Sequence, residues 1–274
     1  MKMKKQFPDL HYLYEAAVQG VGADLDFAAR VFKKKNGRKA ADLREDFCGT
    51  AALACEWVSR SPKHRAWGVD IDQPTLDWGL AHNVPYIGEN AGKLDLICGD
   101  VLTAKTPPAD LVLALNFSYC IFKTREQLRN YFIKARSALK KDGLLVLDIY
   151  GGTEAIEAKL EPRDVGAFTA KDGTKIPVFE YTWDQNIYNV IDHHVVNYIH
   201  FDIPKVGKIK KAFTYDWRLW TLPELQELLF EAGFESAEVY LHGWNKDGES
   251  DETYRPRKNY ENALGWVAYI VGIN

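Results

Sequence analysis

The chain has 274 residues, of which 46% are hydrophobic and 27% charged, and it carries a formal net charge of −3 with a pI near 6.2. This composition predicts a globular protein with a buried core, large enough for one sizeable α/β domain with an addition or for two small domains. No apolar run approaches the roughly 18 residues that a membrane span requires, and the negative charge disfavours a broad nucleic-acid surface.

The N-terminal stretch MKMKKQFPDLHYLY has lysines but no apolar segment after them, so it does not resemble a secretory signal, and we expect a cytosolic protein. The basic run KKKNGRK (33–39) is expected to be a solvated helix end and turn rather than an RNA-binding patch. The cysteines form no C-x-x-C pair and lie among apolar neighbours, which favours buried free thiols over disulfides or a metal site. They are Cys48, Cys55, Cys98 and Cys120.

From residue 40 to residue 150, short apolar runs alternate with longer amphipathic stretches, a pattern typical of alternating strands and helices. We expect strands at 40–46, 65–70, 93–98, 110–116 and 143–149. We expect helices at 51–60, 73–83 and 124–143, the last ending in Lys140, Lys141 and Gly143. Such alternation needs crossovers, so the sheet is predicted to be parallel and covered on both faces, with its ligand at the carboxyl ends of the strands.

After Tyr150 the chain becomes rich in β-branched and aromatic residues. Segment 177–201, with a polar turn around 184–186, and segment 208–220 predict an antiparallel insertion. TLPELQELLFEAGF (221–234) predicts a helix that begins with a capping box and ends at Gly233. Two closing strands, at 235–241 and 263–272, flank an acidic loop.

The segment LREDFCGTAAL (43–53) has the form of a loop that brings backbone close to a pyrophosphate, but only Gly49 of the expected glycines is present. Phe47 and Ala51 stand where two others are expected, and Glu45 and Asp46 place negative charge beside the loop. A pyrophosphate would be repelled there. A ligand with a cationic centre and an amino group would be favoured. An ordinary tight turn is the alternative.

Polar residues also follow the next three predicted strands. Asp70, in GVDID, lies where an acid accepts hydrogen bonds from both ribose hydroxyls of an adenosine; the alternative is a helix cap, a role that Asp72 suits better. Asp100, in ICGDVLT, can accept from an adenine amino group while the Val101 N–H donates to a ring nitrogen, although Asp100 also suits a turn. Asn116, in NFSYC, is expected to line the ligand.

Four motifs in order, EDFCGTA, GVDID, GDVL and DLVLALNFSYC, resemble those of the class I S-adenosylmethionine-dependent methyltransferases, and KKDGLLVLDI resembles that family's fifth strand. The resemblance covers residues 40–150 and extends to 221–234. It implies a Rossmann-like class I methyltransferase fold, with a doubly wound, mostly parallel seven-stranded sheet, an antiparallel last strand and an antiparallel β insertion after the fifth strand. It also implies an S-adenosyl-L-methionine cofactor and methyl transfer to N or O of a small-molecule acceptor.

The same resemblance divides the chain into an N-terminal helical lid segment (1–39), a cofactor-binding core (40–150), a substrate-side insertion (151–220) and a C-terminal part that completes the sheet (221–274). Glu45 is implied to approach the amino group of the cofactor's methionine part. Arg44 is a candidate for its carboxylate, unless it pairs with a structural acid. The other cofactor-binding candidates are Tyr14, Phe47, Gly49, Asp70, Ile71, Asp100, Val101 and Asn116.

A sulfonium already makes its methyl group electrophilic, so the protein mainly has to hold the acceptor in line and exclude water. Tyr119 is a candidate catalytic residue expected over the pocket rim. His193 is a second candidate. His193 and His194 in one strand would point to opposite faces, so at most one can face the pocket, and a structural role is the alternative. Candidate substrate contacts are Tyr119, Trp183, Arg218 and Tyr254, with Tyr181, Tyr215 and Trp217 completing an aromatic wall; the alternative is that the insertion's aromatic residues form its own core.

Three other functions stay open at this level. The eroded glycine pattern permits a protein that binds the cofactor without catalysis. A methyltransferase acting on RNA or protein is disfavoured by the overall charge, and a nicotinamide dehydrogenase is disfavoured by the acidic first loop. We expect no metal and no membrane partner, and either a monomer or a homodimer.

Overall fold

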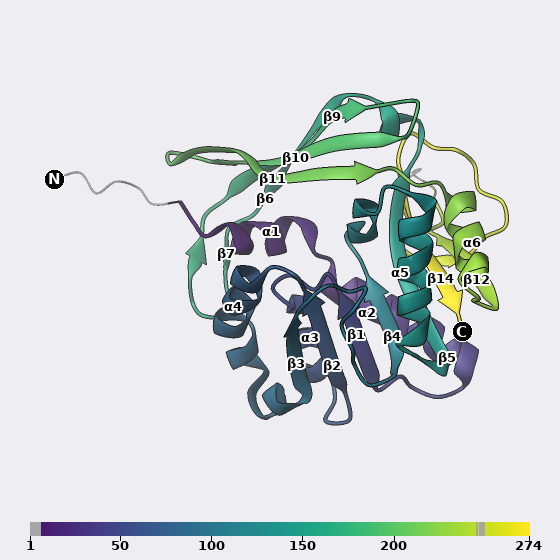
Figure 1. Ribbon diagram of the computed structural model, residues 1–274. Helices are drawn as coiled ribbons and strands as arrows, with labels where there is room; N and C mark the ends of the chain where they lie inside the picture. Colours follow the sequence, from purple (N-terminus) through teal and green to yellow (C-terminus); the bar gives the residue numbers. More distant parts are fainter. Residues whose placement is uncertain (1–6, 245, 247–249) are drawn as a thin grey trace. The chain divides into compact units, whose positions relative to one another are not determined.

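The computed structural model describes residues 7–244, 246 and 250–274. The chain forms two compact units (Figure 1). The first, called the sheet unit, comprises Gly20–Glu154 and Trp220–Asn274, and the second, called the insertion unit, comprises Met1–Gln19 and Ala155–Leu219.

In the described part of the sheet unit, an eight-stranded sheet has the order β13-β12-β14-β5-β4-β1-β2-β3. Strands β1 to β5 are parallel, and β14 is antiparallel to both β5 and β12. The predicted doubly wound sheet with an antiparallel last strand is confirmed, with the two-residue β13 added at its edge. The strands are β1 (Asp42–Asp46), β2 (Arg65–Asp70), β3 (Leu94–Cys98), β4 (Ala109–Ala114), β5 (Leu139–Gly151), β12 (Ser236–Leu241), β13 (Arg255–Pro256) and β14 (Trp266–Ile273).

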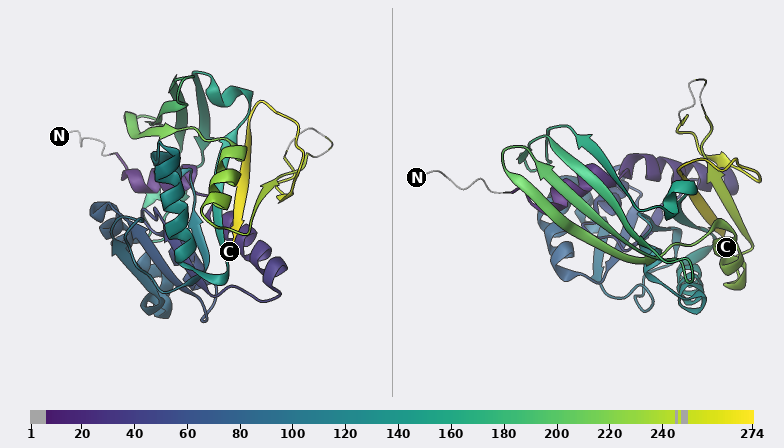
Figure 2. Two further views of the ribbon diagram at one scale, coloured as in Figure 1. Left: turned by 45° about the vertical axis from the view of Figure 1, so that its right-hand side comes forward. Right: turned by 90° about the horizontal axis from the view of Figure 1, so that it is seen from above.

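Helices cover both faces of this sheet (Figure 2). Glu45 of β1 bonds to α3 while its neighbour Asp46 bonds to α5, which places these helices on opposite faces because successive strand residues alternate. The helices are α2 (Val21–Asn36), α3 (Ala52–Ser59), α4 (Gln73–His82), α5 (Arg125–Ser137) and α6 (Leu222–Glu231), with 3₁₀ turns η1 (Val84–Lys93), η2 (Ser118–Ile121) and η3 (Thr153–Ile156), the last reaching into the insertion unit.

The ends of these helices follow from local sequence. Thr124 and Thr221 cap α5 and α6 in complete capping boxes, and Asp72 caps α4 by accepting from the Thr75 N–H. Gly37, in the left-handed region at φ 66°, ends α2 just after its three terminal lysines, as expected for a solvated helix end.

A continuous apolar layer joins α2 and α3 to the sheet. It is formed by fully buried side chains from both helices and from β1, β4 and β5, among them Phe32, Leu43, Leu111, Leu113 and Leu144. Each such side chain removed from water stabilises the fold by roughly 1.5–3 kcal/mol. This layer fixes the strand ends that carry the predicted site.

The insertion unit contains a four-stranded antiparallel sheet, β11-β10-β9-β6, which confirms the predicted antiparallel insertion. Helix α1 packs on it, with the Tyr14 and Phe213 ring centroids 4.8 Å apart. Its elements are α1 (Leu10–Val18), β6 (Lys159–Val165), β7 (Phe168–Thr169), β8 (Lys175–Ile176), β9 (Phe179–Tyr188), β10 (His194–Ile203) and β11 (Gly207–Arg218).

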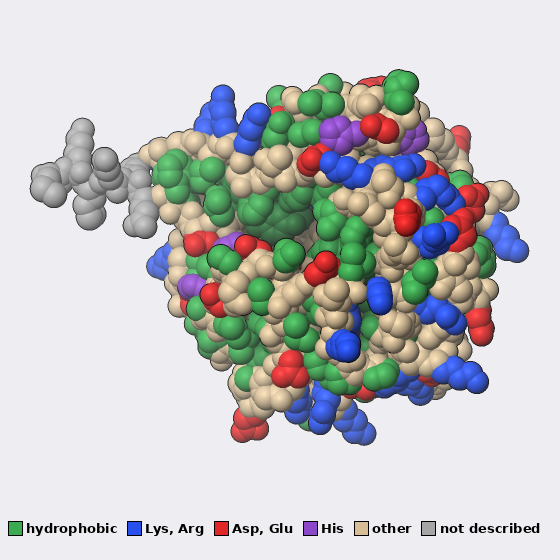
Figure 3. Space-filling view, viewed as in Figure 1, with side chains coloured by type: hydrophobic (Ala, Val, Ile, Leu, Met, Phe, Trp, Pro, Cys, Tyr) green, Lys and Arg blue, Asp and Glu red, His purple; other side chains and the backbone are tan. Residues whose placement is uncertain are grey.

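One face of this small sheet carries polar pairs. His194 pairs with Asp216, and His200 Nε2 lies 2.9 Å from Asp184 Oδ2. Figure 3 shows histidine side chains beside acidic and basic ones in this region. No helix in the described residues is long and apolar enough to cross a membrane.

Three local predictions are wrong. Helix α5 ends at Ser137, not near Gly143, because Leu139 already pairs with Ala109 in the sheet. Residues 184–186 continue β9, and the hairpin turn lies at 189–193 instead. The cysteines are free as expected, but Cys98 is exposed because it ends β3.

Candidate active site at the strand ends

The turn between β1 and α3 keeps the backbone of a glycine loop, although Gly49 is the one expected glycine that it retains. Phe47, Gly49 and Ala51 have φ angles of 59°, 53° and 55°, all in the left-handed region. These are the three positions at which the motif leads one to expect glycine. Because a left-handed conformation costs a non-glycine residue roughly 1–2 kcal/mol, the turn holds strain that the rest of the structure must offset.

Glu45 supplies the missing cap of helix α3. Ala51, at the N-cap, has no side chain that can cap, and Glu45 Oε2 accepts from the Ala54 N–H at 2.9 Å. Burial, together with the charges of Asp70 and Asp24, raises the pKa of Glu45 to about 8, against the lowering effect of that hydrogen bond. A cation beside this carboxyl group would therefore be strongly favoured.

Asp70, at the end of β2, ties the same turn from the neighbouring strand. Its Oδ2 accepts from the Gly49 N–H at 2.7 Å, and its Oδ1 accepts from the Asp72 N–H at 2.9 Å. The next residue, Ile71, is 74% exposed. The acid predicted to meet a ribose therefore lies beside the predicted loop, next to an open apolar side chain.

Arg44 is buried and fully engaged below the turn. Its Nε donates to Asp46 Oδ1 at 2.7 Å, and its two Nη atoms donate to the carbonyls of Val101 and Ala104 at 3.2 and 3.1 Å. The structure thus gives Arg44 the alternative role, pairing with a structural acid. It also connects β1 to the loop after β3.

Asp100 is exposed at the end of β3 and shapes its own turn, because its Oδ1 accepts from the Leu102 N–H at 2.8 Å. Val101 beside it is 5% exposed. Asp100 therefore has the turn-forming role that was its alternative. It lies after a strand that neighbours β2, and its contact with adenine stays a prediction.

Asn116 follows β4 in a turn that is tied by an acid the sequence analysis missed. Asn116 and Phe117 are both left-handed, at φ 56° and 59°, and their N–H groups donate to the two oxygens of Asp148 at 2.8 and 2.9 Å. Burial raises the pKa of Asp148 to about 7, partly offset by these N–H groups. The only sequence signal was its place in the motif KKDGLLVLDI.

Tyr119 does not point over a pocket rim, so that prediction is wrong. Its side chain is 0% exposed, and its hydroxyl donates to the Asp148 carbonyl at 2.8 Å. The 3₁₀ turn η2 directs Tyr119 inward because it begins directly after the left-handed Phe117.

Tyr254 lies in the sheet unit, in an aromatic cluster that the sequence analysis did not predict. Its ring centroid is 4.7 Å from that of Tyr269, and Phe27 of α2 stacks on Tyr269 at 4.0 Å. The Tyr269 hydroxyl donates to Asp24 Oδ1. Burial, followed by the charge of Asp24, raises the pKa of Tyr254 to about 12.

Four candidates belong to the insertion unit: Tyr14, Trp183, His193 and Arg218. His193 lies in the β9–β10 turn with φ 59°, so its predicted place in a strand is wrong. Trp183, Tyr215 and Trp217 do form one aromatic face, with ring centroids 4.3–6.4 Å apart.

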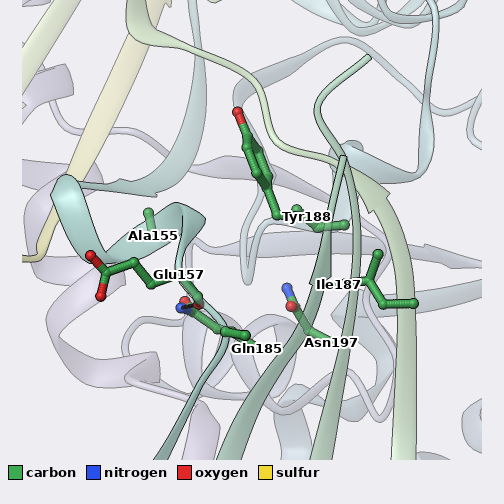
Figure 4. A pocket seen from close by; sticks show the side chains of 8 residues that line it. Ala155, Glu157, Gln185, Ile187, Tyr188 and Asn197 are labelled. Atoms are coloured by element: carbon green, nitrogen blue, oxygen red, sulfur yellow. Dashed lines mark hydrogen bonds between the residues drawn. The ribbon is translucent and has the colours of Figure 1, made fainter. Parts of the chain in front are cut away.

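Arg218 follows Trp217 in β11 and therefore belongs to the opposite face of the sheet. The cation on the aromatic face is Arg163, whose guanidinium lies 5.2 Å from the Tyr181 ring. A small pocket of this unit is lined by none of the four candidates (Figure 4). Its labelled lining residues are Ala155, Glu157, Gln185, Ile187, Tyr188 and Asn197.

Within residues 7–244, 246 and 250–274, no group of three or more His, Cys, Asp or Glu side chains could hold a metal ion. The site is instead a set of carboxylates at the strand ends beside two strained turns.

No protein-family model matches the sequence, and no curated protein matches it. Solved structures match over nearly the whole chain. A methyltransferase of Clostridium acetobutylicum that depends on S-adenosylmethionine has 16% identity and a TM-score of 0.67, over 95% of this chain and 96% of that one. An amino pentose methyltransferase of Micromonospora echinaspora, bound to S-adenosylmethionine, has 15% identity and a TM-score of 0.67, over 99% and 100%.

A sugar N-methyltransferase of a Streptoalloteichus species is similar as well, at 15% identity and a TM-score of 0.65, over 100% of this chain and 98% of that one. The chain therefore has the fold of the class I methyltransferases, as its motifs predicted. The match includes the insertion as well as the sheet, because coverage is nearly complete on both sides.

Proposed function

We propose that the protein is an S-adenosylmethionine-dependent methyltransferase that transfers a methyl group to N or O of a small-molecule acceptor. The observation that carries the proposal is the β1–α3 turn, which has left-handed residues at three glycine positions and the carboxylates of Glu45 and Asp70 bonded beside it. This arrangement lets a ligand come close to the backbone, but its two carboxylates repel a diphosphate. It fits a nucleoside with a positive centre.

The side chains at these strand ends have the chemical groups that would bind this cofactor. In the proposal Glu45 holds the methionine amino group, Asp70 accepts from the ribose hydroxyls, and Asp100 and the Val101 N–H recognise adenine. Ile71, exposed beside Asp70, offers the adenine ring an apolar contact. In the proposal the cofactor comes close to the backbone at Phe47, Gly49 and Asn116. Arg44 supports the turn through its bond to Asp46 and does not contact the ligand.

When bound, the cofactor supplies an electrophilic methyl group. The chain then has to orient the acceptor, keep water out and manage one proton. Tyr119 is unsuited to that last task because it is buried and bonded to a carbonyl. The insertion unit remains the proposed source of acceptor contacts, through Trp183 and its aromatic neighbours.

A small acceptor is supported by two observations. Two structural neighbours act on sugars, an amino pentose in one case and nitrogen of a sugar in the other. The net charge of −3 gives the chain no general attraction for RNA. Amine-bearing or hydroxylated small molecules are therefore the proposed acceptors.

Titration calorimetry with S-adenosylmethionine, its demethylated product and NAD tests the cofactor part. We expect the first two to bind and NAD not to bind. Incubation with methyl-labelled cofactor and either small-molecule extract or RNA tests the reaction. Label in small molecules supports the proposal, label in RNA replaces the acceptor class, and binding without any transfer would mean a non-catalytic binding protein.

A further inference from the structure

A row of polar side chains crosses the buried face of the sheet in the insertion unit. On β10 this face is formed by five side chains, each at most 2% exposed: Val195, Asn197, Ile199, Phe201 and Ile203. Asn197 is the one polar residue among these five. Its register partner on β9 is Gln185, also buried, and the row continues to Lys159 on β6 and Tyr215 on β11.

The two amides at the centre of this row are costly to bury unless hydrogen bonds compensate for the loss of water. The Gln185 Nε2 donates to the Glu157 carbonyl at 2.9 Å, and its Oε1 accepts from Trp183 Nε1 at 3.4 Å. These contacts fix the orientation of the Gln185 amide. Asn197 lies directly across the ladder from it, so the two amide groups are neighbours on one face.

Both amides line the small pocket of this unit (Figure 4). Gln185, Val195 and Asn197 are its buried lining residues, whereas Glu157 and Ile187 are exposed. The cavity has a volume of about 10 Å³, which is enough for one water-sized group. Its lining therefore runs from two buried amides to exposed side chains, one of them apolar.

The size and the lining of this cavity favour a hydroxyl group. A carboxylate, a phosphate or a ring is larger than one water-sized group. An apolar group would remove water from the amides without forming hydrogen bonds to them, and an ammonium group could use only their oxygens. A hydroxyl group both donates and accepts, as each amide does.

We propose that this cavity binds one hydroxyl group of the methyl acceptor, and that Gln185 and Asn197 determine the specificity for hydroxylated acceptors. The hydroxyl group serves recognition and is not the atom that is methylated. Ile187, 49% exposed, offers an apolar contact to the carbon frame that carries the hydroxyl group. This inference rests on the proposed function and narrows its acceptor class.

The test uses two probes that differ by one hydroxyl group, trans-4-aminocyclohexanol and cyclohexylamine. The full chain, labelled with ¹⁵N, is saturated with S-adenosylhomocysteine and titrated with each amine while NMR follows the side-chain amide resonances. The variants Gln185→Met and Asn197→Leu identify the two resonances. We expect trans-4-aminocyclohexanol to shift both resonances and to bind with a dissociation constant about tenfold lower than that of cyclohexylamine.

The variants separate recognition from a merely structural role. Asn197→Leu should bring the two dissociation constants within about twofold of each other, because leucine is similar in size but forms no hydrogen bonds. Gln185→Met should do the same, which keeps the test valid if one variant does not fold. Asn186→Leu is the matched control and should keep the preference, because Asn186 is an exposed amide next to Gln185 on β9.

Equal affinity for the two amines, or binding of neither, with the nucleoside bound would overturn the hydroxyl site alone. A preference that both Gln185→Met and Asn197→Leu leave unchanged would overturn the role of the two amides. Failure to bind the nucleoside would overturn the proposed function, and this inference with it.

Discussion

The turns after β1 and β4 follow neighbouring strands at the point where the sheet reverses its strand order. Both contain strained backbone, but their surroundings differ. Each turn contains left-handed non-glycine residues, and an acid from the next strand outward accepts backbone N–H groups of the turn. Asp70 accepts from Gly49 in the first turn, and Asp148 accepts from Asn116 and Phe117 in the second. Asp70 is followed by Ile71, 74% exposed, whereas the second turn leads into Tyr119, 0% exposed.

This difference distinguishes an acid that supports the fold from an acid that can also contact a ligand. The second turn leads into the fully buried Tyr119, and both oxygens of Asp148 accept its N–H groups, so we expect Asp148 to serve chiefly the fold. The first turn is tied by an acid that directly precedes the exposed Ile71, and it has a second acid, Glu45, beside it. A carboxylate that ties a strained turn and also borders open surface is available to a ligand, and this distinguishes Asp70 from its counterpart.

The largest expected effect is on stability, from Asp148→Ala. The substitution leaves the N–H groups of Asn116 and Phe117 without an acceptor in a left-handed turn, at a cost of about 2–4 kcal/mol in the free energy of unfolding. Urea denaturation measures it. A cost below about 1 kcal/mol would show that the second turn is not held by this acid.

Asp70→Ala should act mainly on binding. We expect S-adenosylmethionine affinity to fall by roughly 1–3 kcal/mol, because buried polar partners are left unpaired, with a smaller change in the free energy of unfolding. Calorimetry on this variant and on Asp148→Ala compares the two acids directly. If Asp148→Ala weakened binding more than Asp70→Ala at a matched folded fraction, the separation of roles would be wrong.

Glu45→Gln should weaken cofactor binding by about 1–2 kcal/mol yet stabilise the free protein at high pH. Because the pKa of Glu45 is raised to about 8 in the folded protein, its contribution to the free energy of unfolding is fully present at pH values below its pKa in the unfolded chain. That contribution is lost as the pH rises through 8. The unfolding free energy of the variant should therefore fall less between pH 5 and pH 8.5.

Thermal or urea unfolding across that pH range measures the effect, with the exposed Glu235→Gln as control. If the free energies of unfolding of Glu45→Gln and of the unmodified chain changed with pH in parallel, the raised pKa of the buried Glu45 would be contradicted.

The smallest expected effect concerns strain in the first turn. Ala51→Gly should be nearly neutral, because relief of a left-handed alanine offsets the loss of a buried methyl group. Ala54→Gly, also 0% exposed but inside α3, should cost about 1 kcal/mol more. Equal costs in urea denaturation would mean that residue 51 carries no strain.

The sequence predicted the sheet well because burial and periodicity determine it, and the strands β1 to β5 fall within a few residues of their expected bounds. Long-range pairing explains the exceptions. Leu139 begins β5 beside Ala109 although the lysines after it are typical of a helix end. Asp184 stays within β9, where it pairs with Tyr198 of β10 in the ladder and its carboxylate accepts from His200 Nε2.

Of the site, the motif positions on β1, β2 and β3 could be identified from sequence, but the partners of each side chain could not. Tyr119 was misjudged because its direction depends on a left-handed Phe117, a conformation that phenylalanine rarely adopts. The hydrogen bond from Tyr269 to Asp24 was missed because the two residues are 245 positions apart in the chain. Neither relation has a local sequence signal.

The most direct test of the account is a crystal structure of the protein with S-adenosylhomocysteine. The account predicts the ribose hydroxyls within hydrogen-bonding distance of the Asp70 carboxylate and the amino group facing Glu45. A nucleoside bound elsewhere, or a ribose turned away from the end of β2, would contradict it.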